Sequence, residues 1–281
     1  MKKRLCFIIA CMACLNVIAQ PYIDPFNIRY TYGFNNGNKT NNNATPFSHI
    51  YIGPDLPFKL KKGSLFVFSP FFDSWNIDSS SDKSYLPVVS SIGLAVTTII
   101  PLDTNHWSLN VTAIPRINSQ GLQLDNSFQM GGVVLAVYKK NKDLTYKFGV
   151  YVNTEFFGFF VLPLVGIAWK INDRNNLFGV LPGRLTYEHK LGDNFYTGTT
   201  FRTITNSYRL NSGNYLRIED HQLSAYLDFY ATKHIVFTGE VGYGMYRQLD
   251  QGAEHNKNYL IDYNWADGMF IKICASYRIR L

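Results

Sequence analysis

Apolar and polar residues alternate along at least six segments of this chain, and the last of these segments runs to its final residue. The odd positions of that segment are Met269, Ile271, Ile273, Ala275, Tyr277, Ile279 and Leu281. The even positions between them include Lys272, Cys274, Ser276, Arg278 and Arg280. Successive side chains of a β-strand point to opposite faces, so a period of two predicts a strand with one apolar and one polar face.

The same alternation predicts strands along most of the chain. Residues 144–156 have the cleanest pattern, with Tyr146 and Phe148 on one face and Lys147 on the other. Residues 128–139 form a strand whose facing the pattern leaves undecided. The other predicted strands cover residues 26–34, 47–60, 64–74, 87–101, 106–116, 195–209, 215–230, 235–249 and 263–281.

The connections between these strands alternate in length. Short turns are predicted at 61–63, 102–105, 140–143, 172–175, 191–194 and 231–234. The connections between them include the longest ones, at 35–46, 75–86, 118–127 and 250–262. Short turns on one side and longer loops on the other are typical of an outer-membrane β-barrel.

The strand count depends on residues 176–190. Leu162-Pro163 and Leu181-Pro182, 19 residues apart, are each expected to precede a strand in a weak internal repeat. Two short turns in succession, at 172–175 and 191–194, require a chain reversal between them, and Pro182-Gly183 is a plausible turn. This reading gives 14 strands. If residues 176–190 form one bent strand instead, the count is 12.

The N-terminus resembles a secretion signal. Lys2, Lys3 and Arg4 precede the apolar run 5–17, which is too short to span a bilayer as a helix. Val17-Ile18-Ala19 fits a signal-peptidase site, so we expect cleavage between Ala19 and Gln20. The alternatives are an uncleaved anchor and lipidation at Cys14. Residues 1–19 are therefore interpreted as a signal peptide and 20–281 as a single barrel domain.

Charge and cysteine content exclude several classes of protein. Removing three basic residues with the signal reduces the net charge from +7 to +4, because 7 − 3 = 4. That value is too small for nucleic-acid binding without a basic run among aromatics. Cys274 is the single cysteine outside the signal, so no internal disulfide can form. No Cys/His cluster has metal-ligand spacing, and we expect no cofactor.

The main alternative fold is a soluble β-sandwich or lipocalin-like barrel, which also alternates but turns its apolar face inward. The membrane barrel is favoured because the predicted strands are long and aromatic residues occur throughout them. The chain has 21 Phe, 19 Tyr and 4 Trp, as expected where rings sit at two lipid–water boundaries. The predicted fold class is thus all-β, a closed antiparallel transmembrane β-barrel of about 12–14 strands.

One long stretch also resembles a known family. It is LPLVGIAWKINDRNNLFGVLPGRLTYEHKLGDNFYTG at 162–198, together with SYRL at 207–210 and the alternating C-terminal strand. These segments are similar to a family of outer-membrane β-barrel proteins without assigned function, known from Gram-negative bacteria of the Bacteroidota type. The resemblance implies a barrel in the outer membrane. It implies no catalytic residues and no substrate.

One pair of residues raises the possibility of catalysis. In His106-Trp107-Ser108 the His and Ser share one strand face, and outer-membrane phospholipases and lipid A deacylases use a His-x-Ser pair of this kind. The Ser-Asn-Gly continuation of the phospholipase is absent, since Leu109-Asn110 follows. The pair also lies beside a short turn on the polar face, away from the lipid. We therefore interpret these residues as lumen lining and expect no enzyme.

The polar strand faces carry charges of both signs. Such charges can form a selectivity ring in a pore or an ion-paired network that stabilises the lumen. The candidate lumen-lining residues are Arg29, Arg116, Lys147, Asn153, Glu155, Arg184, Glu188, Asp228, Glu240, Lys272 and Arg278.

The sequence thus predicts a passive, porin-like conduit or a structural component of the outer membrane. The alternatives are a lipid-processing acyl hydrolase and a barrel that binds or adheres through its long loops. The expected partners are outer-membrane lipid, lipopolysaccharide and the barrel-assembly machinery, which would engage the C-terminal strand. No nucleic-acid partner is expected, and the oligomeric state is not predicted.

Overall fold

The computed structural model describes residues 21–34, 46–59, 64–78, 86–103, 106–256 and 258–281. The predicted signal peptide, most of the predicted loop 35–46 and most of the predicted loop 75–86 lie outside these ranges. Within them, no apolar helix is long enough to traverse a bilayer. The strands are β1 Tyr22–Gly33, β2 Phe47–Gly53, β3 Leu56–Lys59, β4 Leu65–Ile77, β5 Val89–Pro101, β6 Trp107–Gln120, β7 Phe128–Lys139, β8 Leu144–Glu155, β9 Gly158–Lys170, β10 Asn175–Leu181, β11 Arg184–Lys190, β12 Phe195–Arg209, β13 Tyr215–Tyr230, β14 Ile235–Gly252, β15 Tyr259–Asp262 and β16 Gly268–Arg280.

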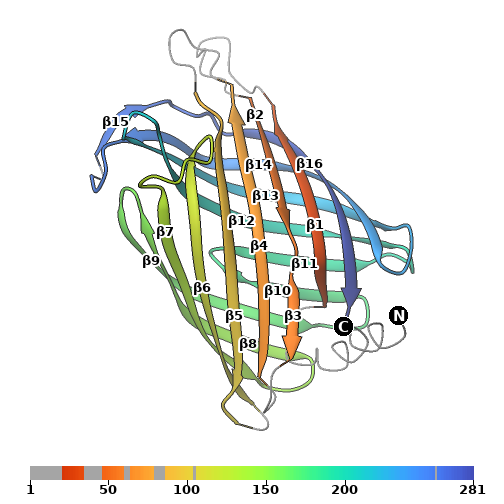
Figure 1. The fold of residues 1–281 in the computed structure, drawn as a ribbon. Coiled ribbons are helices and arrows are strands. Elements are labelled where there is room, and N and C mark those ends of the chain that lie inside the picture. The colour runs from red at the N-terminus through yellow and green to blue at the C-terminus, as the bar shows by residue number, and fades with distance from the viewer. Residues whose placement is uncertain (1–20, 35–45, 60–63, 79–85, 104–105, 257) are drawn as a thin grey trace, which may run out of the picture.

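These strands form one closed antiparallel barrel (Figure 1). β16 pairs with both β1 and β14, which closes the ring between the first strand and the last and confirms the predicted closed barrel. β3 continues the row of β2 against β4, and β15 pairs only with the far end of β14. Of the sixteen described strands, β3 and β15 add no position to the ring, which therefore has fourteen strands. The hairpin turn at Pro182-Gly183 therefore exists, and the twelve-strand alternative is wrong.

The wall separates an apolar outside from a polar inside, as the alternation predicts. On β16, Ile273 is 62% exposed, whereas Lys272 next to it is 4% exposed. Ile271 and Tyr277 are exposed in the same way, and Ser276 is buried. A band of exposed apolar side chains continues around the other strands, so the outer surface of the barrel is hydrophobic.

The two ends of the barrel differ. The short-turn end has the connections at 140–143, 171–174, 191–194 and 231–234 together with the start of β1 and the end of β16 (Figure 1). The long-loop end has the connections at 34–46, 78–88, 121–127, 210–214 and 253–267. Two turns at the long-loop end are tight, at Phe156-Phe157 and Pro182-Gly183.

Some predicted boundaries are wrong, and each error has a structural reason. β4 continues to Ile77 and β6 to Gln120, so the predicted loops 75–86 and 118–127 are shorter than expected. β9 begins at Gly158, so Leu162-Pro163 lies inside a strand instead of preceding one. The two Leu-Pro pairs therefore occupy different structural positions, and the internal repeat does not hold.

The long-loop end contains the main hydrophobic core of the described residues. Its members come from the loop ends of six strands and from three connections, and they pack across the barrel axis: Phe47, Trp75, Ile77, Leu86, Val89, Tyr208, Leu210, Leu216, Ile218, Leu249 and Trp265. Trp75 and Tyr208 are fully buried. A packed core across the axis constricts the lumen at this end.

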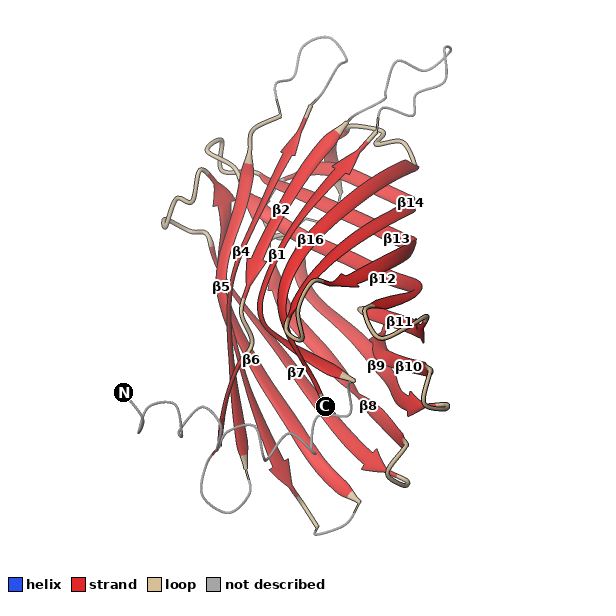
Figure 2. Ribbon diagram, turned by 90° about the vertical axis from the view of Figure 1, so that its right-hand side faces the viewer, coloured by secondary structure: helices blue, strands red, loops and turns tan. Residues whose placement is uncertain are grey.

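β12 adds to this constriction by separating from β11 while it stays paired with β13. Its last pair with β11 joins Arg202 to Arg184, and its end at Arg209 pairs in parallel with Ser119 of β6. β10 and β11 between β9 and β12 have only seven residues each (Figure 2). The upper part of β12 therefore crosses above these two short strands toward β6.

Candidate functional site

A buried polar network holds the crossing of β12 in place. The Glu155 carboxylate accepts hydrogen bonds from Arg116 Nη2 at 2.6 Å and from the backbone N–H of Ser207 at 3.0 Å. Ser207 Oγ and Asn153 Nδ2 also donate to it, and Gln129 Nε2 donates at 3.3 Å. Glu155 is 3% exposed, so its charge is neutralised by Arg116 and not by solvent.

Two further buried ion pairs lie beside the hydrophobic core. His49 bonds Asp73, which also accepts a hydrogen bond from the Tyr208 hydroxyl at 2.9 Å. Arg247 Nε donates to Asp220 at 3.0 Å. Like the Glu155 network, these pairs fill the long-loop end, and we refer to the core and the three polar groups together as the seal.

The short-turn end contains a second polar network, built around two arginines of β16. Arg278 donates to both oxygens of Asp24 and, at 2.6 Å, to Asp228. Arg280 makes a bidentate contact with Glu188 at 2.8 and 3.0 Å. Its guanidinium also stacks 3.5 Å from the centre of the Tyr196 ring. These contacts join β16 to β1, β11 and β13 and leave part of the lumen open between them.

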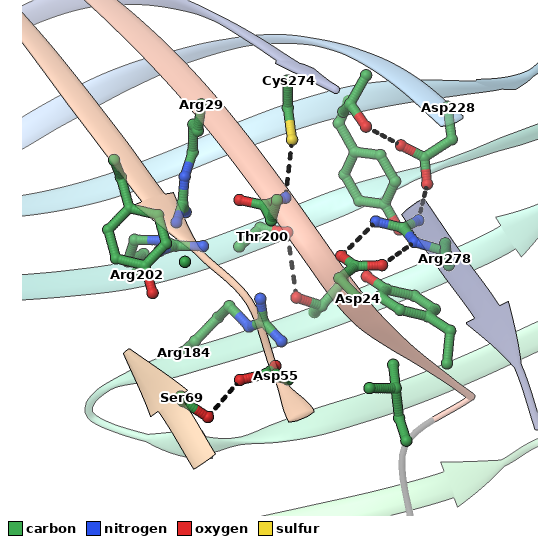
Figure 3. Close-up of a pocket in the computed structure, with 18 of the residues that line it drawn as sticks. Asp24, Arg29, Asp55, Ser69, Arg184, Thr200, Arg202, Asp228, Cys274 and Arg278 are labelled. Atoms are coloured by element: carbon green, nitrogen blue, oxygen red, sulfur yellow. Dashed lines mark hydrogen bonds and ion pairs between the residues drawn. The ribbon is translucent and has the colours of Figure 1, made fainter. Parts of the chain in front are cut away.

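The open part nearer the short-turn end is a cavity of about 360 Å³, the polar chamber (Figure 3). Its walls carry Asp24, Asp55, Asp228, Glu240, Arg278 and Cys274 among others. Ser69 donates a hydrogen bond to Asp55 at 2.6 Å, and Asn27 donates to Cys274 Sγ at 2.9 Å. Such a lining suits water and small polar solutes.

A larger cavity of about 630 Å³, the mixed chamber, lies between the polar chamber and the seal. One side is apolar, with Val133 and Leu135 from β7 and Phe160, Leu162 and Leu164 from β9. The other side is polar and includes the His49–Asp73 pair. The two chambers share four lining residues, so they are adjacent parts of one lumen: Arg29, Tyr51, Arg184 and Arg202.

The three shared arginines converge on the space between the chambers (Figure 3). Arg29 and Arg184 both act electrostatically on Arg202. No ion pair joins any of the three to a carboxylate of the described residues within 4.0 Å. The Nε atoms of Arg29 and Arg202 are buried without a hydrogen-bond partner. Arg29 stacks on Tyr51, 4.6 Å from the ring centre. Asp73, Asp55 and Glu240 interact electrostatically with Arg29, Arg184 and Arg202, respectively, from beyond ion-pair distance. Three cations without a direct ion pair are the strongest binding feature of the lumen.

The structure distributes the sequence-predicted residues over distinct places. Arg29, Arg184, Asp228, Glu240 and Arg278 line the polar chamber. Arg116, Asn153 and Glu155 belong to the seal, Glu188 pairs with Arg280, and Lys272 bonds Glu240 at 2.7 Å. Lys147 is 7% exposed, and the described residues include no ion-pair partner for it.

Sequence reasoning missed three groups that matter here. Arg202 stands on the inward face of a correctly predicted strand, with Tyr196 and Thr200, and period two could have identified it. Asp24 lies before residue 26, where the first strand is predicted to start, but the observed strand β1 already begins at Tyr22. His49 and Asp73 come from strands with weak alternation, and their pairing depends on register.

No hydrogen bond joins the side chains of His106 and Ser108, the pair that we interpret from the sequence as lumen lining. His106 Nδ1 lies 2.9 Å from the backbone oxygen of Lys139, and the imidazole packs against Tyr138. Among the described residues, no group of three His, Cys, Asp or Glu side chains could hold a metal ion.

Comparison with solved structures finds barrels of the porin and channel type at low similarity. The NanC porin has 11% identity and a TM-score of 0.38 over 90% of this chain and 100% of that one. The deltaS2 mutant of the TodX monoaromatic hydrocarbon channel has 10% identity and a TM-score of 0.41 over 95% and 92%. A mutant of the Rh. blastica porin has 10% identity and a TM-score of 0.28 over 92% and 99%. At this level the likenesses carry no functional conclusion.

Among curated protein sequences, none matches this chain. A family model does match it, over residues 69–274. That range contains β5 to β14 complete and most of β4 and β16, which is the greater part of the barrel wall. The chain belongs to the family described as domain of unknown function DUF6268.

Proposed function

We propose that this protein is an outer-membrane β-barrel that serves as a passive conduit for small solutes. Every strand of the closed ring pairs with a neighbour on both sides over at least part of its length, and such closure is the condition for a β-structure to span lipid. The exposed band of apolar side chains supports this location. The expected contacts with lipid, lipopolysaccharide and the barrel-assembly machinery belong to the same proposal.

The observation that carries the proposal is the continuous space inside the wall. The polar chamber of about 360 Å³ and the mixed chamber of about 630 Å³ meet at shared residues. A barrel with a purely structural role has no need of so much internal space, because packed side chains would stabilise it better. The space is nevertheless narrow, and the seal blocks a straight path from the long-loop end. Passage is therefore restricted to small molecules and low flux.

The charge of the region shared by the two chambers determines which solutes the conduit favours. Arg29, Arg184 and Arg202 face the lumen together without paired acids. Fixed positive charge in a narrow polar passage attracts anions and repels cations. The conduit should therefore prefer anions.

Planar bilayers test the function. We expect the purified protein to give small, discrete currents with anion preference. Arg202→Gln should shift the reversal potential toward that of a less selective pore, because one fixed charge is removed at the shared region. Arg174→Gln in an exposed turn is the matched control and should leave selectivity unchanged. Absence of channel events across a range of voltages, from protein that is demonstrably folded, would leave a structural or binding role instead.

A further inference from the structure

The wall has one interruption, above the hairpin turn of β10 and β11. β9 loses its partner after the pair Val165–Leu181, and β12 loses its partner after Arg202–Arg184. The Thr203 N–H then bonds the Gly183 carbonyl oxygen at 3.0 Å. Beyond these points, residues 159–164 of β9 and 204–208 of β12 have no strand partner on the facing side. We refer to the space between these two edges as the wall gap.

The mixed chamber reaches the wall gap. Its lining includes Pro182 and Gly183 at the bottom of the gap, Phe160 and Leu162 on one edge and Thr205 on the other. Gly183 is exposed, and the chamber is not enclosed. A ligand in the mixed chamber is therefore close to the outside of the barrel at this point, whereas the seal separates it from the long-loop end.

The chamber behind the gap has an apolar wall where a barrel lumen is usually polar. β7 turns Val133 and Leu135 inward while Val134, between them, is 43% exposed outside. β9 turns Leu162 inward while its neighbour Val161 is 49% exposed outside. Apolar side chains on both faces of these strands are costly in a wet lumen and favourable against an apolar ligand.

Opposite this apolar wall stand the three unpaired arginines. Arg184 and Arg202 directly border the gap, since they form the last residue pair below it. Arg29 reaches the same space from β1. Buried guanidinium nitrogens without partners cost free energy, and a carboxylate or phosphate oxygen is the acceptor that suits them. The chamber therefore presents apolar surface on one side and anion-binding groups on the other.

The outer surface beside the gap places it at a boundary between apolar and polar surroundings. On the β9 side, Phe159 is 66% exposed and apolar. On the β12 side, the outward face of the adjoining β13 changes from Leu223 to the charged or polar residues His221 and Glu219. Such a change marks the level at which lipid tails give way to headgroups.

We propose that the wall gap is a lateral entrance and that the mixed chamber binds an amphiphile with one anionic head and an apolar tail. The head binds Arg29, Arg184 and Arg202, and the tail lies along Leu162 and Leu135. The molecule enters from the membrane through the gap, because the seal closes the axial approach. This inference rests on the proposed function in that the barrel lies in a membrane, and it names the substrate class of the conduit.

Equilibrium binding to the protein in lipid nanodiscs tests the chemistry of the site. The probe is 11-(dansylamino)undecanoate, a carboxylate with a fluorescent tail, and empty nanodiscs supply the background. We expect decanoate to displace the probe. Decyltrimethylammonium, with the same tail length and opposite charge, should not displace it, and acetate, with no tail, should not either. Equal displacement by decanoate and decyltrimethylammonium would overturn the anionic site, and displacement by acetate would overturn the role of the tail.

Variants test the two sides of the chamber separately. Arg184→Gln combined with Arg202→Gln should weaken probe binding at least about tenfold, because the loss of two charge-assisted contacts exceeds the ~1.4 kcal/mol that corresponds to a factor of ten. Arg174→Gln should not weaken it. Leu162→Trp fills the chamber and should also weaken binding, whereas Val165→Trp, outward on the same strand, should not. Wild-type affinity in the double arginine variant would overturn the proposal. The wild-type displacement series remains decisive if a variant fails to fold.

Binding kinetics test the route of entry. Thr205→Trp narrows the wall gap without removing a contact assigned to the bound ligand. A narrowed entrance slows association, and the association rate is the readout because Thr205 also lines the mixed chamber, where the added ring affects the affinity as well. Thr199→Trp, outward on β12 below the gap, is the matched control and should change neither rate. An unchanged association rate in Thr205→Trp would overturn the lateral entrance. Probe binding without bilayer currents would support this site and contradict the conduit. Currents without probe binding would support the conduit and contradict this site.

Discussion

Among substitutions that remove a single charge, Glu155→Gln should destabilise the seal most. The substitution keeps the size of the side chain but removes the negative charge that faces Arg116 at 2.6 Å. Both side chains are nearly inaccessible, at 9% for Arg116 and 0% for Glu155. Arg116 would then be a buried cation without an acid, and the new amide N–H₂ would face the Ser207 donors.

The structure sets the size of the effect. Removing one partner of a buried ion pair costs about 3–5 kcal/mol, because the remaining charge is left without compensation. The matched control is Glu254→Gln, which breaks the Arg209–Glu254 pair nearby. The Glu254 side chain is 46% exposed, so solvent screens that pair and its loss should cost about 0–1 kcal/mol.

Urea unfolding of the protein in lipid vesicles, followed by tryptophan fluorescence, measures both changes. Two of the four tryptophans, Trp75 and Trp265, lie in the seal, so part of the signal reports on it. Because Glu155 also anchors the crossing of β12 through Ser207, Glu155→Gln should increase conductance in planar bilayers as well. A stability within about 1 kcal/mol of wild type, together with unchanged conductance, would refute the role assigned to this ion pair.

Three further predictions concern the wall and the loop end. Ile273→Arg places a charge on the apolar outer band and should cost roughly 2–4 kcal/mol, which heat-modifiable electrophoretic mobility would reveal as poor insertion, whereas Ile273→Thr should insert. Gly149→Ala should destabilise the barrel by about 1–3 kcal/mol in the urea assay, since an added Cβ would lie 1.9 Å from the Val134 carbonyl oxygen, but Gly239→Ala, which meets nothing within 4 Å, should be neutral. Asp250 lies beyond Gly244, the last β14 residue paired with β16, and is paired with Asp262 of β15. Burial, and to a smaller extent the negative charge of Asp262, raises the pKa of Asp250 to about 6. The folded carboxyl keeps its proton to a higher pH than the unfolded one, so the β14–β15 pairing should lose stability as pH rises through about 6. Hydrogen exchange of residues 259–262, corrected for intrinsic rates, should show more opening at about pH 8 than at about pH 5, and Asp262→Asn should reduce that difference; equal opening at both would contradict the assignment.

The sequence predicts the wall well because each strand needs one apolar and one polar face, and each meets this requirement independently of the other strands. Residues 195–209 and 215–230 match the observed strands to the residue, and the turn at Pro182-Gly183 fixes the count of fourteen. Period two needs no knowledge of neighbouring strands, since the faces are set by the backbone of one strand alone.

The sequence predicts the interior poorly because the interior depends on contacts between distant strands. The facing of residues 128–139 is undecided from the pattern because Val133 faces an apolar chamber while Val134 is exposed outside. Arg116 and Glu155 are 39 residues apart and meet through strand register. Trp75 and Ile77 fall in a predicted polar loop but pack in the seal, since β4 extends to reach it.

Site-directed fluorescence along β16 tests the central claim of a closed barrel in lipid. A bimane label is placed on cysteines substituted, in a Cys274→Ser background, for Ile271, Ile273, Ser276 and Tyr277, and on native Cys274, before refolding into vesicles with brominated lipid tails. The account predicts strong quenching at Ile271, Ile273 and Tyr277, which are exposed outside, and little quenching at Cys274 and Ser276, which face the interior. Equal quenching at odd and even positions, or none at any, would contradict a barrel wall with one face in lipid.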